Sequence, residues 1–241
     1  MTDPRTSSTP TRKYTPKHYQ VLFGSGLLSP AIQAVSASLL SGSVPSDWTR
    51  RWSAGPEKPQ AWLRELVRKR IALQRWRSQA AKGSGALLSE ALSLGDLFNP
   101  ATFINALRQQ TARKLGAAID RVKLVCAWER DARRVADCGC PLPCPLTGLF
   151  LQGAAFHSGE LHDAAPDANE LAAAPSLTIG FVDLDAKDPY PDAASLAVPT
   201  YLSTSREELL CELKMPVTAK DAGAVKFILA GVALFLTEDE Q

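Results

Sequence analysis

Hydrophobic side chains follow two different patterns along this chain, one in each half. In segments 30–41, 59–79 and 100–115 they recur every three or four residues, which places them on one face of an α-helix. Each segment begins with a proline and is followed within four residues by a glycine, which favours the start and the end of a helix respectively. From Val122 onward the apolar runs are short and rich in β-branched or aromatic residues. We therefore predict an α+β fold with a helical N-terminal part and a β-rich C-terminal part.

The helix predicted at 100–115 has the most complete signals. Asn99 is a favourable N-cap, Pro100 suits the first helical position, and Gly116 suits the C-terminal end. The predicted buried face carries Phe103, Ile104, Leu107, Thr111 and Leu115. Four polar residues of the motif lie largely off this face, namely Asn105, Arg108, Gln109 and Arg113. We expect a shorter apolar segment at 87–98 to form a second helix that leads into this one.

The helix predicted at 59–79 has a charged side that is a candidate binding surface. Arg64, Arg68 and Arg75 project together, opposite a wide apolar stripe. They are either a solvated helix surface or a docking face for an acidic partner. Nucleic acid is a poor candidate, because no aromatic residues interleave with these arginines for base stacking. The stripe comprises Trp62, Leu63, Leu66, Val67, Leu73 and Trp76.

Two further tryptophans, Trp48 and Trp52, lie four residues apart after a turn-rich segment. This spacing places both indoles on one face if the segment is helical. We interpret them as packing anchors rather than as ligand-binding residues.

The second half of the protein contains six short apolar runs separated by clusters of Pro, Asp and Gly. Short apolar runs separated by turn-forming residues predict six strands in an antiparallel β-barrel or sandwich. The last run has ten apolar residues without alternation, so we expect a strand buried on both faces, with Gly231 at a bulge or a close backbone approach. The six runs are 122–128, 149–152, 177–181, 196–202, 209–215 and 227–236.

Composition limits the classes of partner. The protein has 241 residues, 45% of them hydrophobic and 22% charged, which is enough for a sizeable core in one or two domains. Its net charge of +2 is nearly neutral, so we expect neither nucleic acid nor a membrane as a partner. Five cysteines without an apolar leader favour free thiols in a reducing, intracellular compartment. Segment 1–17 is predicted to be a flexible tail, with a mitochondrial presequence as the alternative.

No catalytic motif stands out in the sequence. The G-x-x-x-x-G-K-[ST] phosphate loop is absent, so we expect this protein by itself neither to bind nor to hydrolyse ATP. We assign no catalytic residues, no cofactor and no metal ligands. Cys126 and Cys211 lie in apolar runs and are interpreted as buried small hydrophobes.

A cluster of cysteines suggests an alternative interpretation, a metal-binding site. Cys138, Cys140 and Cys144 supply three thiolates, and His157 or His162 would complete a zinc site. The spacing matches no common knuckle, and the two histidines are five residues apart, which does not fit a helical zinc site. We interpret the cluster as a proline-stiffened insertion with incidental thiols.

An acidic loop offers a second alternative, calcium. It lacks the central Gly and the final Glu of a calcium-binding loop, so we interpret it as a solvated loop. Its carboxylates are Asp183, Asp185, Asp188 and Asp192.

The helix at 100–115 also carries a recognisable motif. Residues 99–113, Asn-Pro-Ala-Thr-Phe-Ile-Asn-Ala-Leu-Arg-Gln-Gln-Thr-Ala-Arg, resemble the corresponding helix in the C-terminal domain of dynein heavy chains. The Asn-Ala-Leu-Arg-Gln version is most similar to the second cytoplasmic dynein, the retrograde motor of intraflagellar transport. Two features depart from the family. Phe227 stands where the family usually has Trp, and the loop at 138–145 is longer than the corresponding loop in related dyneins. Supporting matches, in the same order, are Val44-Pro45 before Trp48 and Trp52, Trp62 to Leu66, Gly148 to Gly153, Pro199 with Tyr201 and Arg206, and Gly231 to Leu234.

The resemblance implies a domain arrangement and a role. After a disordered tail at 1–20, residues 21–80 would form the helical lid of the sixth AAA module. Residues 81–241 would form the dynein C-terminal domain, with helices at 86–117 and a β part at 121–237. The domain would be non-catalytic, capping the AAA ring and modulating a minus-end-directed microtubule motor. Pro199, Tyr201 and Arg206 would anchor a strand edge.

The resemblance also implies partners and a location. The partners would be the AAA ring of a dynein heavy chain and other dynein subunits, with microtubules only indirectly involved. ATP would be bound only by AAA modules outside this sequence. The location would be the cytoplasm, the cytoskeleton and the cilium.

The sequence is far shorter than a complete dynein heavy chain. We expect either a piece of a heavy chain or a free-standing interaction module derived from the domain. The module would bind a dynein ring or another acidic partner through Arg64, Arg68 and Arg75. A thiol- or metal-dependent hydrolase is a third, less favoured class.

Overall fold

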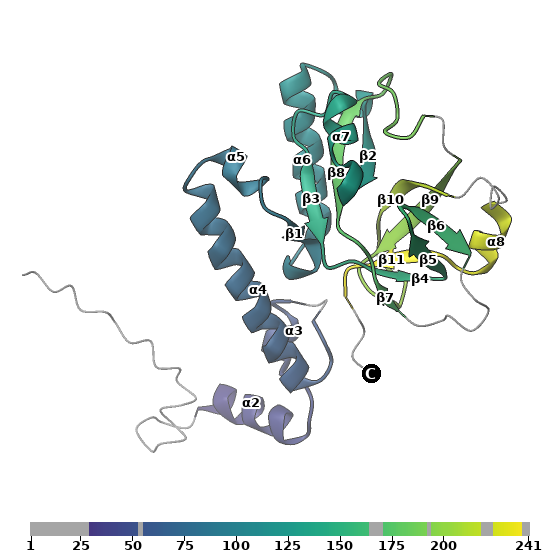
Figure 1. Ribbon diagram of the computed structural model, residues 1–241. Coiled ribbons are helices and arrows are strands. Elements are labelled where there is room, and N and C mark those ends of the chain that lie inside the picture. Colours follow the sequence, from purple (N-terminus) through teal and green to yellow (C-terminus); the bar gives the residue numbers. More distant parts are fainter. Residues whose placement is uncertain (1–28, 53–54, 164–170, 192–193, 218–223, 238–241) are drawn as a thin grey trace, which may run out of the picture. The chain divides into compact units, whose positions relative to one another are not determined.

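The computed structural model describes residues 29–52, 55–163, 171–191, 194–217 and 224–237 (Figure 1). The tail predicted at 1–17 lies outside these residues. The protein divides into two compact units, the first ending at Glu65 and the second beginning at Leu66. Each unit is described by itself.

The first unit is helical. It contains α2 (Pro30–Leu40), α3 (Ser46–Thr49) and the first residues of α4 (Pro59–Ala80). The hydroxyl of Ser29 caps α2 by accepting a hydrogen bond from the Ile32 N–H at 3.3 Å. The helices predicted at 30–41 and 59–79 are therefore confirmed.

The predicted helix at 100–115 is confirmed as α6 (Pro100–Leu115). The Asn99 side chain accepts a hydrogen bond from the Thr102 N–H at 2.9 Å. Gly116 ends the helix in the left-handed region at φ 64°, where a side chain would be strained. Ile104, Leu107, Thr111 and Ala112 are the buried positions after Pro100, whereas Leu115, predicted on that face, is 38% exposed.

The prediction of a helix at 87–98 is wrong. The short helix α5 (Ser84–Leu87) ends where the predicted one begins, and strand β1 (Leu92–Ser93) and the 3-10 turn η1 (Leu94–Asp96) follow. A Cβ atom at Gly95 would lie 2.5 Å from the carbonyl oxygen of Leu236. This close backbone approach between η1 and the C-terminal part could not be read from a local apolar pattern.

The β part forms three separate sheets, and the predicted six-stranded antiparallel barrel or sandwich is wrong. The sheets have the orders β1-β3-β8-β2, β10-β9-β11-β4-β7 and β5-β6, and none closes into a barrel. Two pairs, β1 with β3 and β11 with β9, are parallel. The strands are β2 (Val122–Trp128), β3 (Cys144–Thr147), β4 (Phe150–Gln152), β5 (Ala154–His157), β6 (Glu160–Asp163), β7 (Ala172–Ala173), β8 (Leu177–Asp183), β9 (Ser195–Tyr201), β10 (Leu209–Pro216) and β11 (Ala233–Phe235).

The error in the β part has a physical reason. Five of the six predicted runs do form strands, namely β2, β4, β8, β9 and β10. The strands β3, β5 and β6 have four residues each and include Pro, His or acidic residues, so their apolar signal is too short to predict strands. They complete the first sheet and form the third, which divides the β part.

The apolar run at 227–236 is not one strand. Its first residues belong to helix α8 (Ala224–Leu229) and its last ones to β11 (Ala233–Phe235). Gly231 separates the two at φ 65°, and the N–H groups of Gly231 and Val232 donate to carbonyls of α8, which ends the helix. An apolar run without alternation fits a buried helix as well as a buried strand, so periodicity alone could not decide.

The core of the second unit joins α6 to the sheets. Helix α6 packs on β8 and β2, and the ribbon shows it alongside the first sheet (Figure 1). Short elements fill the connections: η2 (Ile119–Arg121), η3 (Glu129–Asp131) and α7 (Arg133–Asp137). Among the described residues, no helix is both long and apolar enough to cross a lipid bilayer.

Candidate functional site

Residues from three of the supporting family matches meet at the guanidinium of Arg206, an arrangement that we call the Arg206 junction. Arg206 donates through Nη2 to the carbonyl oxygen of Gly231 at 2.6 Å and to Oε1 of Gln152 at 3.0 Å. Its Cζ lies 6.0 Å from the ring centroid of Tyr201 and 5.5 Å from that of Phe235, so the cation also faces two aromatic rings. The junction thereby ties β4, the end of β9 and the end of α8 together.

Gly153 completes the Arg206 junction, because its lack of a side chain lets the backbone at Ala230 approach closely. It has φ 76°, and a Cβ atom there would lie 2.5 Å from the carbonyl oxygen of Ala230. Any side chain would therefore displace the turn that ends α8. Pro199 lies two residues before Tyr201 in β9 and is paired with Glu212 of β10.

The arginines of the predicted docking face are divided between the two units. Arg64 is an exposed residue of the first unit. Arg68 and Arg75 belong to the second unit, where each meets a carboxylate of the same protein. Nη1 of Arg68 lies 3.1 Å from Oδ1 of Asp96, and Nη2 of Arg75 lies 2.6 Å from Oε2 of Glu90. These pairs hold α4 to the segment that follows α5.

A cavity lies beside these two ion pairs. Its volume is about 230 Å³, and its lining combines both pairs with the indole of Trp76 and the side chain of Ile71. Trp76 also packs against Phe103 of α6, with 5.6 Å between ring centroids. The positive and negative charges at the cavity are matched in number, so its charge does not select an anionic or a cationic ligand.

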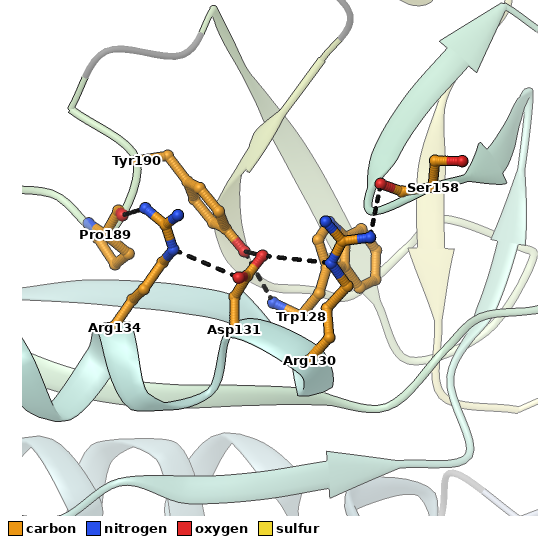
Figure 2. Close-up of polar contacts among 7 residues, drawn as sticks. All are labelled: Trp128, Arg130, Asp131, Arg134, Ser158, Pro189 and Tyr190. Atoms are coloured by element: carbon orange, nitrogen blue, oxygen red, sulfur yellow. Dashed lines mark hydrogen bonds and ion pairs between the residues drawn. The ribbon is translucent and has the colours of Figure 1, made fainter.

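A polar network around Asp131 links η3, α7 and the loop before β9 (Figure 2). The hydroxyl of Tyr190 donates to Oδ2 of Asp131 at 3.2 Å and accepts from the backbone N–H of Trp128 at 3.2 Å. Nε of Arg134 lies 3.4 Å from Oδ1 of Asp131, and the Arg134 guanidinium lies 5.1 Å from the Tyr190 ring centroid. Burial, together with Asp131, raises the pKa of Tyr190 to about 12. Tyr190 is therefore a hydrogen-bonding anchor that stays protonated at neutral pH.

The cysteines are packed as neutral thiols. All five are free, and burial raises the pKa of Cys126 and Cys144 to about 12 and that of Cys211 to about 11. Burial also raises the pKa of Cys140, whose Sγ packs where a side chain on Gly180 would lie. Because the thiolate is the nucleophile and the metal ligand, this environment disfavours both roles. In the described part of the protein, no group of three or more His, Cys, Asp or Glu side chains is arranged to hold a metal ion.

The acidic loop is neutralised by cations of the same protein. Nη2 of Arg121 lies 3.4 Å from Oδ1 of Asp183 and 2.6 Å from Oδ2 of Asp185. Asp188 lies between two lysines, 3.0 Å from Nζ of Lys123 and 2.6 Å from Nζ of Lys214. Asp192, the fourth carboxylate considered for calcium, lies outside the described residues.

The remaining predicted positions are structural or exposed. The rings of Trp48 and Trp52 both lie against Trp62, with 5.0 and 5.5 Å between centroids. In α6, Nε of Arg108 donates to the carbonyl oxygen of Ile119 at 3.1 Å. Pro100 is buried at the start of that helix and Phe103 is half-buried, whereas the exposed positions are Asn105, Gln109 and Arg113.

Sequence reasoning missed the buried ammonium of Lys69. Only 5% of this residue is exposed, and its Nζ donates to the carbonyl oxygens of Gly95 and Leu97 at 2.5 and 2.8 Å. The sequence does carry a signal, because Lys69 lies seven residues from both Trp62 and Trp76 and so belongs to the apolar stripe of α4. Its position there indicates a buried cation, and the structure shows that this cation anchors η1 and the residue after it.

Comparison with known proteins agrees with the family resemblance found in the sequence. The family model for the C-terminal domain of the dynein heavy chain matches residues 17–236. Cytoplasmic dynein 2 heavy chain 1 from Chlamydomonas reinhardtii is 34% identical over 224 residues, and that from Homo sapiens is 34% identical over 217 residues. Each alignment covers 90% of this sequence and 5% of the relative. The ciliary dynein beta chain of Heliocidaris crassispina is 25% identical over 89% of this sequence.

The sequence corresponds to a small part of each of these relatives. It spans about 5% of the length of the curated relatives that it matches. The matched part is the C-terminal domain and is not itself the ATPase site of an AAA module. The protein belongs to the family of C-terminal domains of dynein heavy chains.

Proposed function

We propose that this protein acts as the non-catalytic C-terminal region of a dynein heavy chain of the cytoplasmic dynein 2 class. In this role it caps the AAA ring and modulates minus-end-directed movement in intraflagellar transport. The observation that carries the proposal is the match to the family model over residues 17–236. The higher identity to cytoplasmic dynein 2, 34% against 25% for the ciliary beta chain, supports the class.

The proposed role assigns partners and a place. The AAA ring and other dynein subunits are the direct partners, and microtubules are reached only through the rest of the motor. The place of action is the cytoplasm, the cytoskeleton and the cilium. Nucleotide is bound by AAA modules and not by this region.

The internal pairing of charged groups supports a mechanical role rather than a chemical one. The guanidinium of Arg206 is committed to the carbonyl of Gly231 and to two aromatic rings. Asp131 and Asp188 are likewise committed to neighbouring side chains. Groups held in this way fix the geometry of the fold and leave little freedom for proton transfer or nucleophilic attack.

The proposal is tested by a domain exchange. The C-terminal domain of a cytoplasmic dynein 2 heavy chain is replaced by residues 17–236 of this protein, and microtubule-stimulated ATPase and gliding velocity are measured. The exchanged motor should behave like the parent, and a motor lacking the domain should differ from both. An exchanged motor that behaves like the deletion would contradict the proposal, as would saturable binding of millimolar ATP to the isolated protein in calorimetry.

The alternative is a free-standing module that binds an acidic partner through Arg64, Arg68 and Arg75. Its support is that the Arg75 side chain remains 68% exposed. We favour the first proposal because Arg68 and Arg75 already pair with Asp96 and Glu90. An immunoblot of the source cells separates the two, since a band near 26.0 kDa indicates the module and a much larger band indicates a heavy chain.

A further inference from the structure

The β5–β6 hairpin brings two histidines onto one surface. His157 ends β5 and pairs with Glu160, while His162 of β6 pairs with Ala155. Positions two apart on a strand share a face, so His157 and His162 are diagonal neighbours on the same face of the hairpin. Their rings meet edge to face with 5.9 Å between centroids. The five-residue spacing that excludes a helical metal site therefore creates a cross-strand pair in a hairpin.

The tautomer of His162 follows from its hydrogen bond. Its Nε2 lies 3.2 Å from the carbonyl oxygen of His157. A carbonyl oxygen only accepts, so Nε2 must carry the proton, and the neutral ring then has its lone pair on Nδ1. Metal-ligating histidines have this arrangement, in which the second ring nitrogen donates to a carbonyl or a carboxylate and orients the ring.

The turn between the two histidines is held from outside the hairpin. Nη1 of Arg130 donates to the carbonyl oxygen of Ser158 at 2.8 Å, as Figure 2 shows. Ser158 and Gly159 both have positive φ, 54° and 93°, and a Cβ atom at Gly159 would lie 2.8 Å from Cζ of Arg130. Because the guanidinium holds the turn, the backbone positions of the two histidines are set without a bound ligand, and only their side chains must rotate to bind one.

We propose that His157 and His162 form a two-histidine site for a divalent transition-metal ion of the Zn²⁺, Ni²⁺ and Cu²⁺ class. With metal–nitrogen bonds of about 2.1 Å, two imidazoles on one tetrahedral ion have ring centroids about 5 Å apart. Side-chain rotation that brings the rings closer by about 1 Å reaches this geometry from the observed pair. Nδ1 of His162 and a ring nitrogen of His157 are the protein ligands, and water completes the coordination.

The donor atoms define the selectivity of the site. Imidazole nitrogen suits Zn²⁺, Ni²⁺ and Cu²⁺, whereas Mg²⁺ and Ca²⁺ prefer oxygen ligands. The ion bridges β5 to β6 and thereby stabilises the hairpin. Leu161, beside His162, forms a parallel bridge with Val217, so the ion also steadies the contact of the hairpin with the segment after β10.

The site is tested by titrating the full-length protein, expressed without a histidine tag, with NiCl₂ in a calorimeter. One ion should bind per molecule. His157→Gln and His162→Gln should each weaken binding at least tenfold, which is about 1.4 kcal/mol. Matched controls, His18→Gln at the remaining histidine and Cys138→Ser at a partly accessible thiol, should leave the affinity unchanged. Paramagnetic broadening of amide signals by Ni²⁺ should be confined to the hairpin.

Three results would overturn the site. The first is no saturable binding of Ni²⁺ or Zn²⁺ to the unmodified protein. The second is an unchanged affinity in both His157→Gln and His162→Gln, and the third is loss of binding in Cys138→Ser, which would assign the ion to a thiol. Folding of each variant is checked by its far-ultraviolet dichroism, and competition by excess Mg²⁺ should leave the Ni²⁺ affinity unchanged.

Discussion

The guanidinium of Arg206 holds the carbonyl oxygen of Gly231 at 2.6 Å, from a backbone that is itself in the left-handed region at φ 58°. Such a φ is uncommon for a residue with a side chain. Gly231 is also the residue that ends α8 before the central strand β11. Two residues far apart in the sequence, both with left-handed backbones, therefore fix the point at which the C-terminal strand enters its sheet.

Arg206→Ala should lower the free energy of unfolding by about 1–3 kcal/mol, because it removes a charge-assisted hydrogen bond and two cation–π contacts. Arg206→Lys should recover only part of the loss, since an ammonium lacks the planar fork that reaches both Gly231 and Gln152. Urea unfolding measures both. Arg113→Ala, at an exposed position of α6, is the control and should change stability by less than about 0.5 kcal/mol. Equal losses at the two arginines would refute the role of the junction.

Leu107→Ala should lower the free energy of unfolding by about 2–5 kcal/mol, because Leu107 is only 5% exposed and its truncation leaves a cavity beneath α6. Leu115→Ala is the matched control, since it makes the same change in the same helix at a position that is 38% exposed. Its loss should be under half that of Leu107→Ala. Similar denaturation midpoints for the two variants would show that the buried face of α6 has been assigned incorrectly.

The caps of α6 could be predicted because a cap is a local signal. Asn99 accepts from a backbone N–H three residues later, and Gly116 takes the left-handed φ that its neighbours avoid. Gly231 ends α8 by the same device. The sequence nevertheless predicts a strand there, because the other nine residues of the run at 227–236 are apolar and nothing local shows whether a run is buried by a sheet or by a helix end.

The candidate sites were less predictable because they depend on partners that are distant in sequence. Arg206 and Gly231 could be named from the family resemblance, but their hydrogen bond spans 25 residues and depends on the end of α8. The pairs of Arg68 with Asp96 and of Arg75 with Glu90 arise because the segment after α5 folds back on α4. A helix viewed by itself shows only which side chains share a side, and not what covers them.

Stability should decrease in acid partly through Asp188. Hydrogen bonds from Lys214 and Lys123 hold the pKa of this carboxyl below its usual range. A lowered folded-state pKa contributes stability that is present above the unfolded-state pKa, about 3.9, and is lost as the pH falls through the folded-state value. Asp188→Asn should therefore flatten the dependence of the unfolding free energy on pH below about pH 4.

At neutral pH, Asp188→Asn should lower the free energy of unfolding by less than about 1 kcal/mol, because the carboxylate is partly exposed and solvent screens its ion pairs with the lysines. Urea unfolding between about pH 2 and pH 7 follows both effects. Lys214→Met removes the nearer of the two cations and should flatten the acid limb by a smaller amount. An acid limb of unchanged slope in Asp188→Asn would contradict the assignment.

The last prediction concerns β11, which lies between β9 and β4 in the five-stranded sheet. Phe235 and Leu234 are completely buried, and Leu236, which follows the strand, is 1% exposed. Full burial of each large side chain contributes about 1.5–3 kcal/mol, so the loss of all three approaches the whole stability of an ordinary domain, about 5–15 kcal/mol. Removing the strand also leaves β9 and β4 with unpaired backbone groups in the interior.

A protein that ends after Gly231 should therefore lose the cooperative folding of the five-stranded sheet and keep the helical signal of α4 and α6. A protein that ends after Thr237 retains β11 and is the matched control. Limited proteolysis and near-ultraviolet dichroism measure the difference. The shorter variant should be cut within β9 and β10 and should lose its aromatic dichroism, while the control behaves like the full-length protein. If the shorter variant kept a protease-resistant β part with the same melting midpoint, the central position of β11 would not be what holds this sheet together.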